Sequence, residues 1–127
     1  MPLIANGDIV DAASALRCKK WTGADGLMIG RATFGDPWIF AQVSAALAGK
    51  PVPERPCLAD RVDVALRQFE MARADKGEHI ACLEARKHFA WYLRGVSHSS
   101  YYKTQISAIS SMEDIYRIGE GIKRDLT

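Results

Sequence analysis

Two short apolar runs near the N-terminus, residues 3–5 and 27–29, each end in a turn of small residues. Asn6-Gly7-Asp8 follows the first run, Gly30-Arg31-Ala32 follows the second, and a helix-sized segment over residues 9–21 separates them. A strand, a helix and a second strand in this order form a βαβ unit, in which the two strands run parallel. The second run is apolar throughout, which is typical of a buried parallel strand.

Capping signals predict where the helices beside these strands begin and end. Asp11 is expected to cap a helix over residues 12–21, and Gly23 is expected to follow it in the left-handed conformation that commonly ends helices. Asp36 is expected to cap a second helix, with Pro37 at its first position, where a missing N–H costs nothing. The N-terminal part of the chain is therefore predicted to alternate strands with helices.

The pattern changes after a stretch that contains three prolines, residues 51–57, which we interpret as a linker. Everything beyond it is predicted to be helical. Two longer helices are predicted over residues 59–76 and 78–96, and a shorter one, capped by Ser99 or Ser100, ends at 108. The last helix begins with the capping box Ser110-Ser111-Met112-Glu113 and ends at 125. The prediction is thus a mostly helical chain, with an α/β part over residues 1–50 followed by a four-helix, bundle-like domain over residues 58–127.

Composition narrows the class of protein only slightly. The chain has 127 residues, of which 48% are hydrophobic and 25% are charged, as in ordinary globular proteins. No apolar run approaches the roughly 20 residues that span a bilayer, and Met1-Pro2 leads directly into the first strand without a signal peptide pattern. The three cysteines are far apart, which favours reduced thiols in a cytoplasmic protein. A chain that opens on a core strand indicates a piece of something longer.

The two glycine turns are candidates for binding an anion. Glycine lets backbone N–H groups approach a phosphate, and in (β/α)₈ barrels the phosphate site frequently uses the loops after strands 7 and 8. The same turns also occur in open α/β sheets, so spacing alone leaves both architectures open. Asp8 is interpreted as a turn former rather than as a catalytic carboxylate, and Arg31 as a contact to an anion.

The helix predicted over residues 79–96 has two contrasting faces. On a wheel of about 100° per residue, one face gathers the apolar residues Cys82, Ala85, Phe89, Leu93 and Val96. The other face gathers Lys87, Trp91, Arg94 and His98, if the helix extends to His98. Basic side chains around an aromatic ring suit RNA, because cations meet phosphates and the ring stacks a base. Alternatively, Trp91 packs against a neighbouring helix and the cations form a solvated rim.

No residue of the chain is predicted to be catalytic, and no metal site is predicted. The three histidines match neither an HExxH motif nor a ligand spacing with the cysteines. His88 is therefore interpreted as a packing or RNA-facing residue. Cys82 is placed on the apolar face of its helix, where a buried thiol is unreactive.

Taken together, several segments resemble bacterial tRNA-dihydrouridine synthases. They are IANGDI at residues 4–9, GADGLMIGRA at 23–32, PWIF at 37–40 and ARKHFAWYL at 85–93, in this order. That family combines an FMN-binding (β/α)₈ barrel with a helical tRNA-binding domain, and it reduces uridine in tRNA to 5,6-dihydrouridine with NADPH. The resemblance implies that residues 1–50 form the last two βα units of the barrel and that residues 58–127 form the tRNA-binding domain.

The same resemblance assigns the site residues. It implies that Asn6, Gly7, Asp8, Gly30 and Arg31 line the phosphate end of FMN. It also implies RNA contacts for Arg86, Lys87, His88, Trp91 and Arg94. The flavin-ring pocket and the catalytic cysteine of the family belong to earlier barrel strands, and none of the three cysteines here stands in the matching motif.

Two alternatives remain beside an enzyme of this family. The helical domain is either a stand-alone RNA-binding module with a vestigial half-barrel, or a protein-interaction module whose basic face is only solvated. In each case, strands 3–5 and 27–29 would expose unpaired backbone and apolar side chains. We therefore expect a homo-oligomer with an interface centred on residues 1–50.

Overall fold

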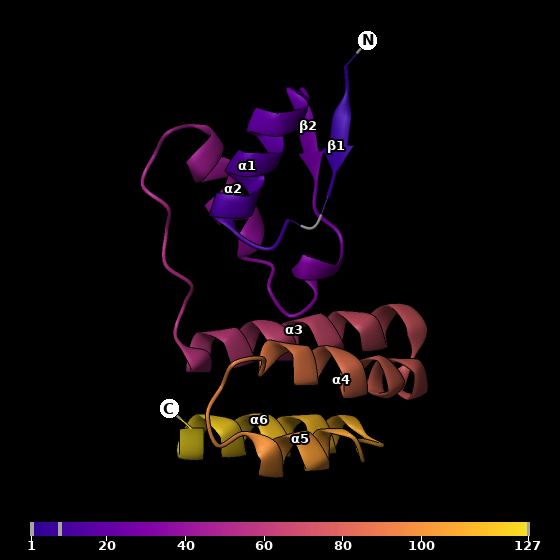
Figure 1. The fold of residues 1–127 in the computed structure, drawn as a ribbon. Helices are drawn as coiled ribbons and strands as arrows, with labels where there is room; N and C mark the ends of the chain where they lie inside the picture. Colours follow the sequence, from indigo (N-terminus) through magenta and orange to yellow (C-terminus); the bar gives the residue numbers. More distant parts are fainter. Residues whose placement is uncertain (1, 8, 127) are drawn as a thin grey trace. The chain divides into compact units, whose positions relative to one another are not determined.

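The computed structural model describes residues 2–7 and 9–126. The chain divides into two compact units, Met1–Arg55 and Pro56–Thr127. The first unit carries a short sheet and two helices, and the second is entirely helical (Figure 1). Among the described residues, no helix combines the length and the apolar composition needed to cross a membrane.

The first unit contains the predicted βαβ arrangement. Strand β1 (Ile4–Asn6) pairs in parallel with β2 (Gly26–Met28), with Ala5 opposite Leu27 in the register. Both strands are short because each run contributes only a few apolar residues before its glycine turn. The carboxylate of Asp25 accepts a hydrogen bond of 2.8 Å from the N–H of Leu3, which ties the start of β1 to the turn before β2.

Helix α1 (Ala12–Thr22) begins and ends as the sequence predicts. The side chain of Asp11 accepts a hydrogen bond of 2.7 Å from the N–H of Ser14, and the hydroxyl of Ser14 accepts one from the N–H of Asp11, which completes a capping box. At the other end, Gly23 has φ 63° and donates its N–H to the carbonyl of Lys19. The left-handed conformation at Gly23 is the one that glycine adopts without a steric cost.

The next helix begins later than predicted. After β2 comes a 3₁₀ turn, η1 (Arg31–Thr33), and then α2 (Ile39–Leu47), whose first turn has no side-chain cap. The prediction that Asp36 caps this helix is wrong. The carboxylate of Asp36 instead forms an ion pair of 2.6 Å with the guanidinium of Arg55, at the far end of the first unit. That partner is distant in sequence, and local capping rules do not reveal it.

A small apolar core holds the first unit together. Its buried members are Ile9, Ala15, Ile39 and Val43, with Cys18, Leu27, Ile29 and Ala32 packed against them. The two strands are largely exposed, and Leu3, Ile4 and Met28 each keep more than half of their surface in solvent. The prediction of a buried second strand is therefore wrong for the described chain, because helices cover one side of this two-stranded sheet only.

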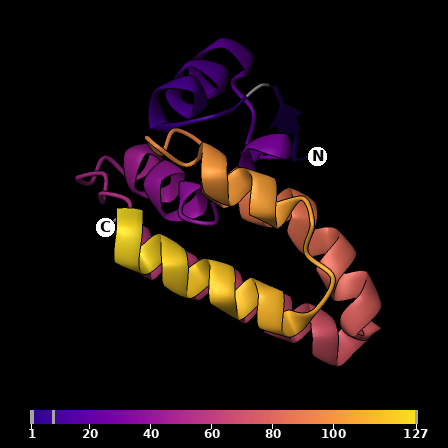
Figure 2. The same cartoon turned by 90° about the horizontal axis from the view of Figure 1, so that it is seen from below.

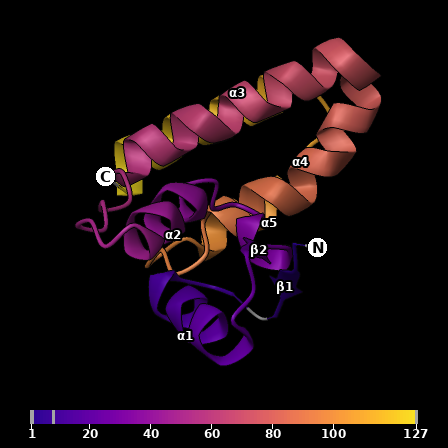
Figure 3. The ribbon, with the colours of Figure 1, turned by 90° about the horizontal axis from the view of Figure 1, so that it is seen from above.

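Four helices form the second unit: α3 (Leu58–Lys76), α4 (Glu78–Tyr92), α5 (Ser100–Ile106) and α6 (Met112–Leu126). Helices α3 and α4 meet at the turn around Gly77 and form a V in Figure 3. Helix α6 runs alongside α3, as Figure 2 shows, and α5 packs against both α4 and α6. The core is built from large apolar side chains, and Phe69 and Phe89 lie at its centre with ring centroids 5.4 Å apart.

Helix ends and caps in the second unit differ from the prediction at several points. Helix α5 ends at Ile106 rather than at 108, and the hydroxyl of Ser99 bonds to the carbonyl of Val96 instead of capping α5. Helix α4 ends at Tyr92, so His98 lies outside the helix, exposed and with φ 60°. The box that opens α6 uses Ser111 and Asp114: the hydroxyl of Ser111 accepts the N–H of Asp114, and the carboxylate of Asp114 accepts the N–H of Ser110. Glu113, one residue earlier, points into solvent.

Candidate functional site

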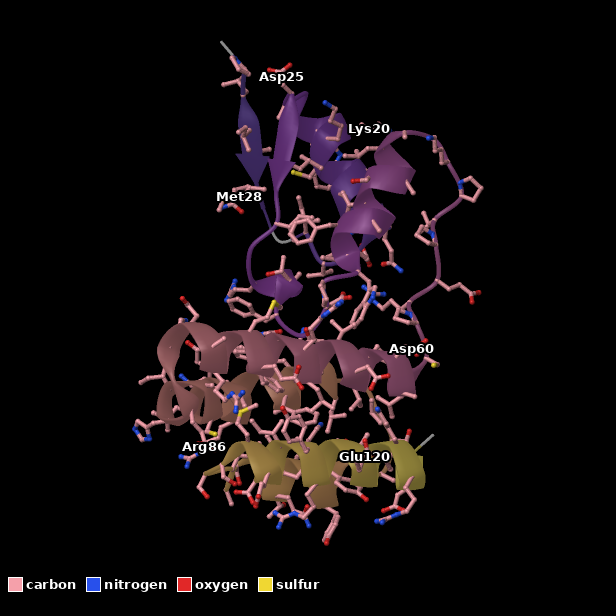
Figure 4. All side chains as sticks on the ribbon, turned by 180° about the vertical axis from the view of Figure 1, so that it is seen from behind. Lys20, Asp25, Met28, Asp60, Arg86 and Glu120 are labelled. Atoms are coloured by element: carbon pink, nitrogen blue, oxygen red, sulfur yellow. The ribbon has the colours of Figure 1, made fainter. Side chains whose placement is uncertain are left out.

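The loops after β1 and β2 lie at one edge of the sheet. The strands are parallel and Asn6 is opposite Met28, so the two loops that follow the strands leave the sheet side by side. Figure 4 shows Asp25 and Met28 at opposite ends of β2, with Met28 at the edge from which the loops depart. Asn6, Gly7, Gly30 and Arg31 are all exposed there. Asp8, which the resemblance places with them, lies outside the described residues.

The carbonyl of Gly30, in the turn after β2, is hydrogen-bonded within the turn itself. The carbonyl of Gly30 accepts two hydrogen bonds from Thr33, one from its N–H at 3.0 Å and one from its hydroxyl at 2.8 Å. The N–H of Phe34 closes the next bond onto the carbonyl of Arg31. In such a turn the first N–H groups point away from the bonded carbonyls, as they do at every helix start. The turn therefore presents donors, and the exposed side chain of Arg31 stands at the same point.

The start of α1 is less suited to an anion than the sequence indicates. The carboxylate of Asp11 already occupies that end of the helix, and hydrogen bonds from Ser14 hold the pKa of Asp11 below its usual range. The side chain of Asp11 is thus ionised at neutral pH and would repel a phosphate placed on the helix axis. Of the two loops, the one at Gly30 is the better anion site.

Space at the two glycines supports the same distinction. A Cβ added at Gly30 would meet no described atom within 4 Å, whereas one added at Gly7 would lie 3.9 Å from the thiol of Cys18. The half-buried side chain of Cys18 therefore lies next to the Asn6-Gly7 turn. A ligand has open access to the backbone at Gly30.

The second candidate surface lies on α4. Lys87 and Trp91 are four residues apart on α4 and share one side of the helix, away from the buried residues Cys82, Ala85 and Phe89. Arg94 follows in the turn after the helix, where its N–H bonds to the carbonyl of Trp91. Leu93 is also fully buried, so the predicted apolar face is confirmed for Cys82, Ala85, Phe89 and Leu93, whereas Val96 is only half-buried and lies beyond the end of α4. Lys87 and Arg94 are exposed, and Trp91 is half-buried.

Trp91 and His88 form a pair. Their ring centroids are 5.0 Å apart and the rings are perpendicular, an edge-to-face arrangement. Burial lowers the pKa of His88, so the imidazole is neutral at pH 7. His88 therefore contributes a hydrogen-bonding group and a ring surface to this site, but no positive charge.

Arg86 lies apart from the face formed by Lys87, Trp91 and Arg94. Its Nε donates a hydrogen bond of 2.8 Å to the carbonyl of Ile109, which links α4 to the connection before α6. Figure 4 shows its side chain at the margin of the second unit. The sequence does not reveal this bond, because the two residues are 23 positions apart. Arg86 thus has a structural role, since it holds the connection between α5 and α6 against α4.

The described part of the chain offers few candidate residues for metal binding or for nucleophilic catalysis. Residues 2–7 and 9–126 contain no group of three His, Cys, Asp or Glu side chains arranged to hold a metal ion. The Cys82 thiol is buried, and desolvation raises its pKa, which keeps it protonated. Cys57 is exposed in the linker, and Cys18 lies under the first glycine turn. None of the three has a cationic partner that would activate it among its described hydrogen bonds and ion pairs.

Comparison with known proteins gives a consistent result. A family model described as dihydrouridine synthase (Dus) matches residues 1–124. A probable tRNA-dihydrouridine synthase of Mycobacterium tuberculosis (strain CDC 1551 / Oshkosh) is 37% identical to the chain over 115 residues. A probable tRNA-dihydrouridine synthase of Rickettsia conorii is 33% identical over 122 residues. The tRNA-dihydrouridine synthase B of Pasteurella multocida is 32% identical over 114 residues.

These matches cover 91%, 96% and 90% of the chain, but only 30%, 36% and 34% of the respective relatives. The chain therefore spans about a third of the length of the curated relatives it matches. The match runs through both structural units, from the strands to the last helix. The chain belongs to the dihydrouridine synthase family.

Proposed function

We propose that this chain is the C-terminal portion of an FMN- and NADPH-dependent tRNA-dihydrouridine synthase, an oxidoreductase that reduces uridine in tRNA. The family match over residues 1–124 carries the proposal. In it, residues 1–50 form the last two βα units of a (β/α)₈ barrel, residues 51–57 the linker, and residues 58–127 the tRNA-binding domain. The proposed enzyme would modify tRNA in the cytoplasm.

The first unit would hold the phosphate end of FMN. The parallel strands place both loops at their carboxyl ends, where ligands bind in barrels of this type. Gly30 and Arg31 supply an open backbone and a cation, and Asn6 and Gly7 supply the facing turn. The flavin supplies hydride transfer when it is bound. The part of these residues is to hold and orient the phosphate, and Asp8 would join them.

The second unit would bind tRNA through Lys87, Trp91 and Arg94, with His88 beside Trp91 and Arg86 as a separate contact. The cations are exposed and the indole edge meets the imidazole, so phosphate contact and stacking are both available. The alternative is a stand-alone RNA-binding or protein-interaction module, and it is favoured by one observation. The second unit has its own core, so it does not need the first one to close its apolar surface.

The isolated 127-residue chain is expected to purify without flavin and to show no NADPH oxidation. A bound ligand normally has about 70–90% of its surface buried, and the two loops described here contact one end of FMN only. An absorbance spectrum of the purified chain, read for the visible absorption of flavin, checks this directly. Stoichiometric flavin in the purified chain would contradict it, and would mean that the ring pocket is also present.

Replacing Lys87 by alanine is expected to weaken tRNA binding and to reduce its salt dependence. Each phosphate contact contributes about −0.7 to −0.9 to the slope of log affinity against log salt concentration, so the slope should become shallower by about one contact. Lys50→Ala, an exposed lysine in the first unit, is the matched control and should bind as the unaltered chain does. Gel-shift titrations at several salt concentrations measure both. Identical slopes for all three chains would favour a merely solvated basic face.

The chain is also expected to self-associate through residues 1–50. Leu3, Ile4 and Met28 are exposed to 63%, 71% and 54%, beside a two-stranded sheet with both outer edges open. In the described residues the sheet has only these two strands, and an edge that no further strand covers pairs readily with a second copy. Sedimentation at micromolar concentration tests the expectation. A monomer in which residues 3–5 and 27–29 remain protected from hydrogen exchange would disprove it.

A further inference from the structure

The chain segment between Glu84 and Glu113, which includes the end of α4 and all of α5, carries no acidic residue. The segment contains four cations, Arg86, Lys87, Arg94 and Lys103, and all four are exposed. The segment itself therefore carries positive charge only, and a carboxylate that reaches α5 comes from α6, where Asp125 accepts the Tyr102 hydroxyl.

Tyr101 projects from this segment. Helix α5 is fixed against α6 by its neighbour Tyr102, whose hydroxyl contacts the carbonyl of Gly121 at 3.0 Å and the carboxylate of Asp125. Tyr102 is buried, and this places Tyr101 on the outer side of α5 with 66% of its surface exposed. The two rings are edge-to-face, with centroids 5.2 Å apart, so Tyr102 supports the exposed ring of Tyr101.

The connection before α5 is compact, and it brings Tyr101 near the end of the α4 face. The N–H of Arg94 bonds to the carbonyl of Trp91, the N–H of Val96 to that of Leu93, and the hydroxyl of Ser99 to the carbonyl of Val96 at 2.8 Å. These bonds coil residues 93–99 instead of extending them. Arg94, His98 and Tyr101 are all exposed and lie within eight positions of one another along this compact turn and the start of α5.

We propose that Tyr101 is a stacking platform for an unpaired base of the tRNA, and that the RNA surface extends from Lys87, Trp91 and Arg94 onto α5. This inference rests on the proposed function. An exposed aromatic face beside cations suits single-stranded or looped RNA, because every base offers a flat face and its phosphate needs a cation nearby. Tyrosine in this role contributes contact area and no charge.

The test compares tRNA binding by Tyr101→Ala, Tyr101→Phe and Tyr116→Ala in the full 127-residue chain. Tyr116 is the matched control, since it is also an exposed tyrosine of the second unit, but it is hydrogen-bonded to Glu70 at 2.9 Å on a surface with acidic residues. Fluorescence anisotropy with an unmodified tRNA transcript at several salt concentrations gives both affinity and salt slope. Far-UV circular dichroism verifies that each variant is folded.

Tyr101→Ala is expected to lower the affinity about 5- to 150-fold, the range that base–aromatic stacking supports, with an unchanged salt slope. Tyr101→Phe and Tyr116→Ala should bind as the unaltered chain does. If Tyr101→Ala binds normally while Lys87→Ala binds weakly, this inference is wrong and the proposed function stands. If the unaltered chain binds no tRNA at any salt concentration, the proposed function itself fails. Binding of poly-glutamate as tight as that of tRNA would show that the surface accepts acidic proteins, and would overturn the stacking role.

Discussion

Replacing Phe89 by alanine is expected to destabilise the second unit by about 3–5 kcal/mol. Phe89 is fully buried on α4, and its ring centroid lies 5.4 Å from that of Phe69 on α3. Helices α3 and α4 form the most extensive helix pair of the unit, so the cavity would open where its core is centred. A small domain has a free energy of unfolding of only about 5–15 kcal/mol, and the variant should therefore lose a large part of its stability.

Urea denaturation followed by far-UV circular dichroism measures this loss, since most helical residues belong to the second unit. Leu83→Ala is the matched control, because Leu83 is on the same helix with 39% of its surface exposed. That substitution should change the free energy of unfolding by about 0.5 kcal/mol or less. Equal effects of the two substitutions would contradict the placement of the apolar face of α4.

The local signals in the sequence predict the βαβ unit and the limits of α1 correctly. Asp11 and Gly23 act on atoms within four residues of themselves, so their roles are encoded where they stand. The helical period places Cys82, Ala85 and Phe89 in the core for the same reason, because a helix repeats its faces every few residues. Features that depend on neighbouring residues are readable from one sequence.

Features that depend on distant partners are not readable in this way. Asp36 has the right residue type and position for a helix cap, but Arg55 offers a charged partner 19 residues later, and the helix begins at Ile39. Two bonds likewise join distant parts of the chain: Arg86 on α4 bonds to Ile109 in the connection before α6, and Glu78 on α4 accepts the N–H of Met112 on α6 at 2.9 Å. Their energies depend on how the helices pack, which no local pattern describes.

The candidate sites divide along the same line. The sequence predicts that two glycine turns lie side by side, since parallel strands require it, and the predicted cap Asp11 already puts a carboxylate at the start of α1. Similarly, the cations of α4 are visible as a pattern, whereas Tyr101 is not. Two consecutive tyrosines give no indication of which one is buried until Tyr102 is seen to contact α6.

That contact makes Gly121 the position where the smallest substitution should have a large effect. A Cβ added at Gly121 would lie 2.8 Å from Cε1 and 3.1 Å from the hydroxyl oxygen of Tyr102, and this ring is buried and hydrogen-bonded. Gly121→Ala would therefore displace the ring and disturb the contacts of its hydroxyl with the Gly121 carbonyl and with Asp125.

We expect Gly121→Ala to destabilise the second unit by about 1–3 kcal/mol, although alanine by itself favours a helix by about 1 kcal/mol. Gly119→Ala on the same helix is the control: its nearest contacts are the methyl groups of Leu66 at 3.2 Å, at the flexible end of a half-buried side chain, so its net effect should be close to zero or stabilising. Thermal unfolding should then show a fall in Tm of about 4–8 °C per kcal/mol for Gly121→Ala alone. In a background of Tyr102→Ala the obstructing ring is absent, so the added methyl group at 121 should cease to destabilise; if its cost persists there, the steric explanation is incorrect.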